Sequence, residues 1–109
     1  MRMRTTLALA LVAFALPALA ADGDAYELVI KNHRFSPDRL EIPAGKKVTL
    51  VVRNLDDTPE EFESHDLKRE KVVKGGDEIR VIVGPLNAGE YAFVGEYHED
   101  TAKGVVVAK

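Results

Sequence analysis

Short runs of apolar residues recur along residues 26–109, and turn-forming residues separate them. Several of these runs alternate strictly between apolar and polar positions, which is typical of strands that bury one face. Residues 67–73 are mixed and charged, and the pattern there fits either a strand or a helical turn. About seven short strands at turn-marked intervals predict an all-β, Greek-key β-sandwich. The predicted strands cover residues 26–31, 39–42, 47–53, 61–65, 78–83, 89–94 and 105–107.

The first twenty residues follow a different pattern from the rest of the chain. Arg2 and Arg4 precede an apolar run that ends in Ala18-Leu19-Ala20, a small-x-small cleavage pattern. This arrangement predicts a secretory signal peptide over residues 1–20, because the apolar core is short for a bilayer span. The alternative is an uncleaved membrane anchor. We therefore expect a single exported, periplasmic domain over residues 21–109.

Charge and sulfur content narrow the partners and ligands of this domain. The whole chain has 15 basic and 18 acidic residues, and loss of Arg2 and Arg4 makes its net charge of −3 still more negative. An acidic domain argues against nucleic acid and favours a cationic ligand or a basic protein surface. The chain has no cysteine, and its two methionines, Met1 and Met3, both lie in the predicted signal peptide. Thiolate and thioether ligation, which soft Cu(I) prefers, is therefore excluded for the exported domain.

Candidate metal ligands follow the strand predicted at residues 89–94. If the strand continues, Glu96 and His98 share the face of Val94, and strand residues two apart lie about 7 Å from each other. A carboxylate and an imidazole at the rim of an apolar strand suit a metal site. Asp100 follows closely and is a further candidate ligand.

A second group of candidates lies on the strand predicted at residues 61–65. Alternation places Glu61, Glu63 and His65 on the face opposite Phe62 and Ser64. Carboxylates and imidazoles together bind hard or borderline cations, including iron, Cu(II), Mn(II) and Zn(II). The alternative is that these glutamates form a solvated strand face without a ligand. His33, in an Asn-His-Arg turn, reads as a surface or turn residue.

The chain resembles cupredoxins, small copper-binding sandwich proteins, over nearly all of residues 21–109. At the positions where cupredoxins carry a cysteine and a methionine ligand, this chain has Gly95 and a residue near Ala102. The first histidine ligand of cupredoxins stands just before a core aromatic residue. Here that aromatic residue is Phe62, and Glu60 and Glu61 precede it, which leaves open which of them takes that place. The matching segments are Phe35-Ser36-Pro37, Ile42-Pro43-Ala44-Gly45, Gly89-x-Tyr91-x-Phe93, His98, Gly104 and Val105-Val106-Val107.

Two segments are similar to a narrower group within the cupredoxins, at residues 61–67 and 95–100. This group consists of the periplasmic cupredoxin-like subunits that accompany bacterial iron permeases of the Ftr type, and a related Glu-aromatic-Glu motif occurs in the Efe-type cupredoxin domain. The resemblance implies a subunit that binds copper or iron and oxidises ferrous iron or delivers it to a membrane permease. It also implies that the metal residues are Glu61, Glu63, Glu96 and His98.

Three functions therefore remain open from the sequence. The first is a metal-binding accessory of ferrous iron uptake, with or without ferroxidase activity. The second is a metal carrier without enzymatic activity, and the third is a metal-free interaction module whose acidic end binds a basic partner.

Overall fold

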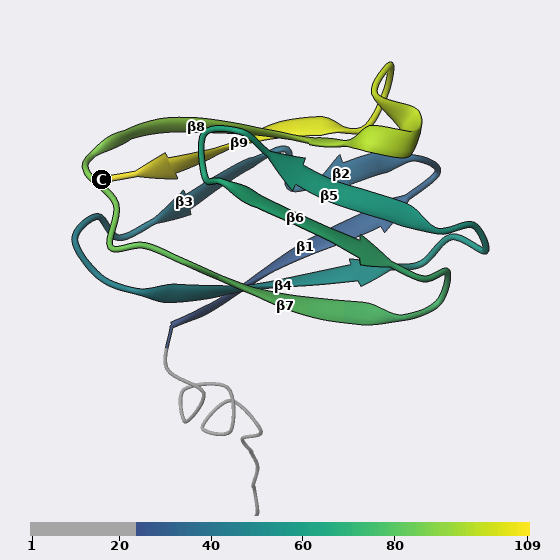
Figure 1. Cartoon of the computed structure of the whole chain (residues 1–109), viewed down its shortest axis with the longest axis horizontal. Helices are drawn as coiled ribbons and strands as arrows, with labels where there is room; N and C mark the ends of the chain where they lie inside the picture. Colours follow the sequence, from purple (N-terminus) through teal and green to yellow (C-terminus); the bar gives the residue numbers. More distant parts are fainter. Residues whose placement is uncertain (1–23) are drawn as a thin grey trace, which may run out of the picture.

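The computed structural model describes residues 24–109. The predicted signal peptide, residues 1–20, lies outside the described residues. The described part contains nine strands and one short 3-10 helix, η2 (Figure 1). Among residues 24–109, no helix is long and apolar enough to cross a membrane. The elements are β1 Ala25–Lys31, β2 Arg34–Ser36, β3 Arg39–Ile42, β4 Val48–Asn54, β5 Glu60–Ser64, β6 Arg69–Val73, β7 Glu78–Val83, β8 Gly89–Gly95, η2 Glu96–His98 and β9 Lys103–Ala108.

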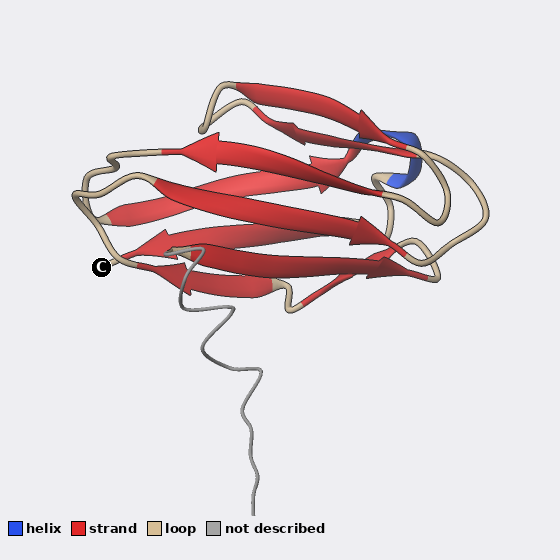
Figure 2. Cartoon of the chain, turned by 90° about the horizontal axis from the view of Figure 1, so that it is seen from below, coloured by secondary structure: helices blue, strands red, loops and turns tan. Residues whose placement is uncertain are grey.

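The strands form two packed sheets, so the predicted all-β sandwich is confirmed (Figure 2). One sheet has the strand order β2-β1-β4-β7 and the other β3-β9-β8-β5-β6. Both sheets are mixed, because β1 pairs parallel with β4 and β3 pairs parallel with β9. Nine strands exceed the predicted number of about seven. The predicted turn at residues 32–37 contains β2, and the ambiguous segment at residues 67–73 resolves into a turn followed by β6.

Apolar residues at alternate strand positions meet between the sheets and form the core. Three phenylalanines dominate it: Phe35 from β2, Phe62 from β5 and Phe93 from β8. The ring of Phe35 stands edge-on to that of Phe93 with centroids 4.8 Å apart, and the rings of Phe62 and Phe93 lie 5.4 Å apart. Burying each such side chain contributes about 1.5–3 kcal/mol. The cluster joins the two sheets and so fixes the end of the sandwich where the candidate residues lie.

One end of the sandwich gathers three connecting segments, and we call this end the pole. It consists of the turn at residues 32–33, the loop at residues 55–59 and the segment at residues 96–102, and it lies at the right in Figure 1. The three segments are far apart in sequence. Hydrogen bonds from Asn32 and His33 to Asp56, and from Thr101 to His33, join them directly. All candidate ligands from the end of β8 onward lie in this region.

Candidate metal centre

The chain leaves the sheet directly after Gly95, and this changes the expected relation between Glu96 and His98. The last residue pair between β8 and β9 is Val94 with Lys103, and residues 96–98 then form η2. The backbone N–H groups of Thr101 and Ala102 both donate to the carbonyl of His98, which closes the segment. The expectation that Glu96 and His98 share a strand face is therefore wrong. A 3-10 turn directs the two side chains to different neighbours.

His98 pairs with a buried carboxylate, that of Glu60. Its Nδ1 lies 2.6 Å from Glu60 Oε2, and the side chains of His98 and Glu60 are 25% and 2% exposed. The other oxygen, Oε1, accepts hydrogen bonds from the backbone N–H groups of Glu61 (3.0 Å) and Tyr97 (2.9 Å). An ionised carboxylate only accepts hydrogen bonds, so the histidine tautomer with its proton on Nδ1 suits this contact. We call Glu60 and His98 the inner pair.

Glu60 and Ala102 occupy the space that a cysteine at position 95 would need. A Cβ atom at Gly95 would lie 2.6 Å from Glu60 Cδ and 2.8 Å from the Cβ of Ala102. Ala102 is itself fully buried. A copper centre with a thiolate ligand therefore does not fit this site. A carboxylate oxygen and an imidazole nitrogen stand there instead, and these suit Cu(II), iron and other borderline or hard ions.

His33 is a member of this site that the sequence did not reveal. It lies in the turn between β1 and β2, as predicted, but its ring also stacks on that of His98. The ring centroids are 3.6 Å apart and the planes differ by 12°. His33 Nε2 lies 3.5 Å from the hydroxyl oxygen of Thr58. Sequence patterns carry no signal for this contact, because it depends on how the turn folds over the pole.

A second set of acidic side chains lies on the outer face of β5, opposite the inner pair. Glu61, Glu70 and Glu96 each offer an oxygen atom, and these atoms lie within 4.8 Å of one another. The hydrogen bond with Glu70, together with desolvation and the neighbouring Glu96, raises the pKa of Glu61 to about 7. The hydrogen bond with Glu96 likewise raises the pKa of Glu63. We call these four glutamates the outer cluster, and they form a region where a cation would relieve charge repulsion.

The structure thus separates the four predicted metal residues into two neighbouring sets. Glu61, Glu63 and Glu96 belong to the outer cluster, whereas His98 belongs to the inner pair. The strand alternation behind this prediction is confirmed, because Phe62 and Ser64 are buried, whereas Glu61 and Glu63 are only partly buried.

The structure also shows which glutamate faces the histidine. It is Glu60 that lies against His98, while Glu61 faces outward. The sequence left open whether Glu60 or Glu61 takes the place of the first cupredoxin histidine, and Glu60 is the one that faces His98. The two remaining candidates, His65 and Asp100, are exposed in turns after β5 and η2 and belong to neither set.

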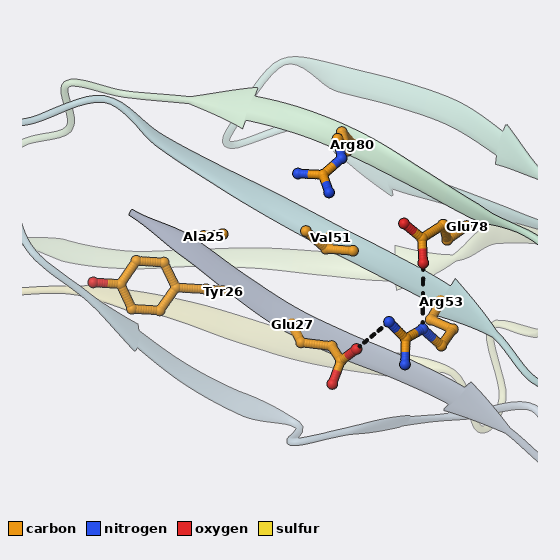
Figure 3. A pocket seen from close by; sticks show the side chains of 7 residues that line it. All are labelled: Ala25, Tyr26, Glu27, Val51, Arg53, Glu78 and Arg80. Atoms are coloured by element: carbon orange, nitrogen blue, oxygen red, sulfur yellow. Dashed lines mark ion pairs between the residues drawn. The ribbon is translucent and has the colours of Figure 1, made fainter. Parts of the chain in front are cut away.

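A shallow pocket on the outer face of the first sheet has a different character (Figure 3). Its carboxylates are already compensated: Arg53 lies between Glu27, at 3.0 Å, and Glu78, at 3.4 Å. Val51 and Tyr26 add apolar surface, and no imidazole lines it. This pocket therefore lacks the donors of the predicted metal site, which lies at the pole.

Comparison with known proteins places the chain in a family. Residues 4–108 match the family described as "Cupredoxin-like domain". The uncharacterized protein RP394 of Rickettsia prowazekii (strain Madrid E) is 46% identical over 81 residues, which are 74% of this chain and 65% of that protein. The chain thus spans about 65% of the length of that relative.

Solved copper proteins share the fold at low sequence identity. Auracyanin A, a blue copper protein from Chloroflexus aurantiacus, has a TM-score of 0.66 and 14% identity over 78% of this chain and 98% of its own. A purple cupredoxin from Nitrosopumilus maritimus has a TM-score of 0.60 and 23% identity, covering 77% and 99% of the two chains. Amicyanin from Paracoccus versutus has a TM-score of 0.63 and 20% identity, covering 83% and 88%. With a family match over nearly its whole length, the chain belongs to the cupredoxin-like family.

Proposed function

We propose that this protein is a periplasmic metal-binding accessory of high-affinity ferrous iron uptake, which holds copper or iron through oxygen and nitrogen ligands. The observation that carries the proposal is the inner pair: a buried carboxylate, Glu60, 2.6 Å from the Nδ1 of His98. A metal ion that displaces the shared proton would be held by Glu60 Oε2 and His98 Nδ1. The bound ion would supply Lewis acidity and, if it is copper or iron, one-electron chemistry.

The outer cluster gives the proposal its second part, a place where ferrous iron arrives as cargo or substrate. Glu61 and Glu96 lie close to the inner pair. The backbone N–H groups of Glu61 and of Tyr97, the residue after Glu96, both donate to the carboxylate of Glu60. Several carboxylates stabilise Fe(III) more than Fe(II), because the higher charge gains more from anionic ligands. This donor set favours the loss of one electron from Fe(II). The electron acceptor would be Cu(II) at the inner pair or dissolved dioxygen.

A membrane iron permease is the proposed recipient of the iron. The similarity of residues 61–67 and 95–100 to permease-associated cupredoxin-like subunits supports this partner. The acidic outer cluster supports it as well, because it would both attract the cation and face a basic surface.

The test is a calorimetric titration of the purified protein, once with Fe(II) under argon and once with Cu(II). Stoichiometric binding is expected for wild type, loss of Cu(II) binding for Glu60→Gln and His98→Ala, and weaker Fe(II) binding for Glu61→Gln. Glu90→Gln is the matched control, because Glu90 is an exposed glutamate paired with Arg39 at the start of β8, outside both sets. Absence of binding by wild type would contradict the proposal.

Loss of Fe(II) in air, measured with and without Cu(II), then separates the two metal-dependent functions. Turnover beyond one Fe(II) per protein indicates a ferroxidase. Stoichiometric binding without turnover indicates a carrier that only delivers the metal.

A further inference from the structure

We propose that His33 is a positioning residue that holds the His98 imidazole against Glu60, and that Asp56 in turn holds His33 in place. This inference rests on the proposed function, in which His98 is a metal ligand. It concerns how the pole keeps that ligand in one orientation before any metal arrives.

The stacking geometry favours a covering role for His33 over a role as a further ligand. The His33 and His98 planes differ by only 12° at a centroid distance of 3.6 Å. The nitrogen lone pairs of two nearly parallel rings lie in separate planes, and so they do not converge on one ion. His98 is 25% exposed, and the ring of His33 covers one of its faces. The other constraint on His98 is its bond to Glu60, which lies at the ring edge.

The turn that carries His33 is held in a conformation that non-glycine residues rarely adopt. Asn32 and His33 have φ values of 54° and 58°. The left-handed region is unfavourable for residues with a side chain, so other contacts must fix these two residues. Asp56 supplies these contacts: Oδ1 accepts from Asn32 N at 2.7 Å and Oδ2 accepts from His33 N at 3.0 Å. These two bonds lower the pKa of Asp56 against the opposing effect of burial, which is the largest single influence.

Two further hydrogen bonds connect this arrangement to the rest of the pole. The backbone N–H of Asp56 donates to the side chain of the buried Asn54, at 3.0 Å. The hydroxyl of Thr101, beyond η2, donates to the carbonyl of His33 at 2.6 Å. The turn is thus fastened both to the loop after β4 and to the segment that carries His98. A change at Asp56 is therefore expected to reach His98 through His33.

The experiment compares His33→Ala, His33→Phe and Asp56→Ala in the full protein. The first readout is the affinity for Cu(II), and the second is the NMR shift of the His98 ring protons in the metal-free protein. His33→Ala is expected to weaken Cu(II) binding by about 10-fold, the lower end of the effects seen when a group that orients a ligand is removed. It is also expected to move the His98 signals, because the ring current of the stacked neighbour is lost. Asp56→Ala shifts both readouts in the same direction.

His33→Phe decides between positioning and ligation, since phenylalanine keeps a stacking ring but has no nitrogen donor. Recovery of wild-type affinity and of a ring-current shift supports the positioning role. If His33→Phe binds as weakly as His33→Ala, or if His33→Ala behaves as wild type, the inference is overturned. Failure of wild type to bind Cu(II) would refute the proposed function instead, and the NMR shift in the metal-free protein would still decide whether the stack orients His98.

Discussion

Replacing Glu60 tests whether the inner pair also stabilises the fold. Its carboxylate is buried and accepts three hydrogen bonds, two from backbone N–H groups and one from His98. Glu60→Ala removes all three acceptor contacts and leaves the N–H groups of Glu61 and Tyr97 without a partner. Truncating one member of a buried pair lowers the free energy of unfolding by about 3–5 kcal/mol, and we expect a decrease of that size for Glu60→Ala.

Glu60→Gln is the more informative change because it keeps the shape of the side chain. The amide oxygen can still accept from both backbone N–H groups, so only the bond to His98 is altered. A hydrogen bond to a charged group contributes about 1.5–3 kcal/mol, and this is the expected loss for Glu60→Gln. The free energy of unfolding should therefore decrease in the order wild type, Glu60→Gln, Glu60→Ala.

Urea denaturation of the metal-free protein at pH 7 measures these differences. Glu90→Gln, which changes an exposed glutamate, serves as the control and is expected to change the free energy of unfolding by less than about 0.5 kcal/mol. If Glu60→Gln also changes the free energy of unfolding by less than about 0.5 kcal/mol, the short contact to His98 does not stabilise the protein.

Three further predictions concern the surroundings of the inner pair. The pKa of Glu61 is raised to about 7 from its usual 4.5, so between these pH values the folded state binds more protons than the unfolded state. The stabilisation that this carboxyl group contributes is therefore complete below about pH 4.5 and is lost as the pH rises through 7. Glu61→Gln should flatten this dependence in urea denaturation at several pH values, and an unchanged slope would contradict it. Gly95→Ala should cost about 1–3 kcal/mol by overpacking against Glu60, and a smaller loss in a Glu60→Ala background would confirm the contact by double-mutant cycle. Asn54→Ala should lower the thermal midpoint because the buried amide donates to two carbonyls; a midpoint equal to wild type would show that these bonds contribute nothing.

Much of the fold could be predicted from the sequence because strand alternation acts locally. The predicted strand at residues 78–83 agrees with β7, and β4 differs from its prediction by one residue at each end. The short strand β2 escaped prediction because its formation depends on pairing with β1, and the residues themselves read as a turn. The strand β6 was ambiguous for a related reason: four of its five residues are exposed, so no apolar period marks it.

The candidate site could be predicted in composition but not in arrangement. The sequence predicts glutamate and histidine as candidate ligands in place of sulfur, and the structure does bring Glu61 together with Glu96. Which of the two neighbouring glutamates, Glu60 or Glu61, pairs with His98 could not be predicted, because the pairing depends on η2 turning the chain out of the sheet. A carboxylate before a core aromatic at the missing ligand position was the one sequence signal that pointed toward it.

The electron paramagnetic resonance spectrum of the protein with one equivalent of Cu(II) shows whether Glu60 and His98 hold a metal ion without sulfur. We expect a single Cu(II) species with nitrogen and oxygen ligands and no intense thiolate absorption band in the optical spectrum. We expect this species to be lost in both Glu60→Gln and His98→Ala. A spectrum of free Cu(II) from wild type, or the same bound species in wild type and both variants, would contradict this expectation.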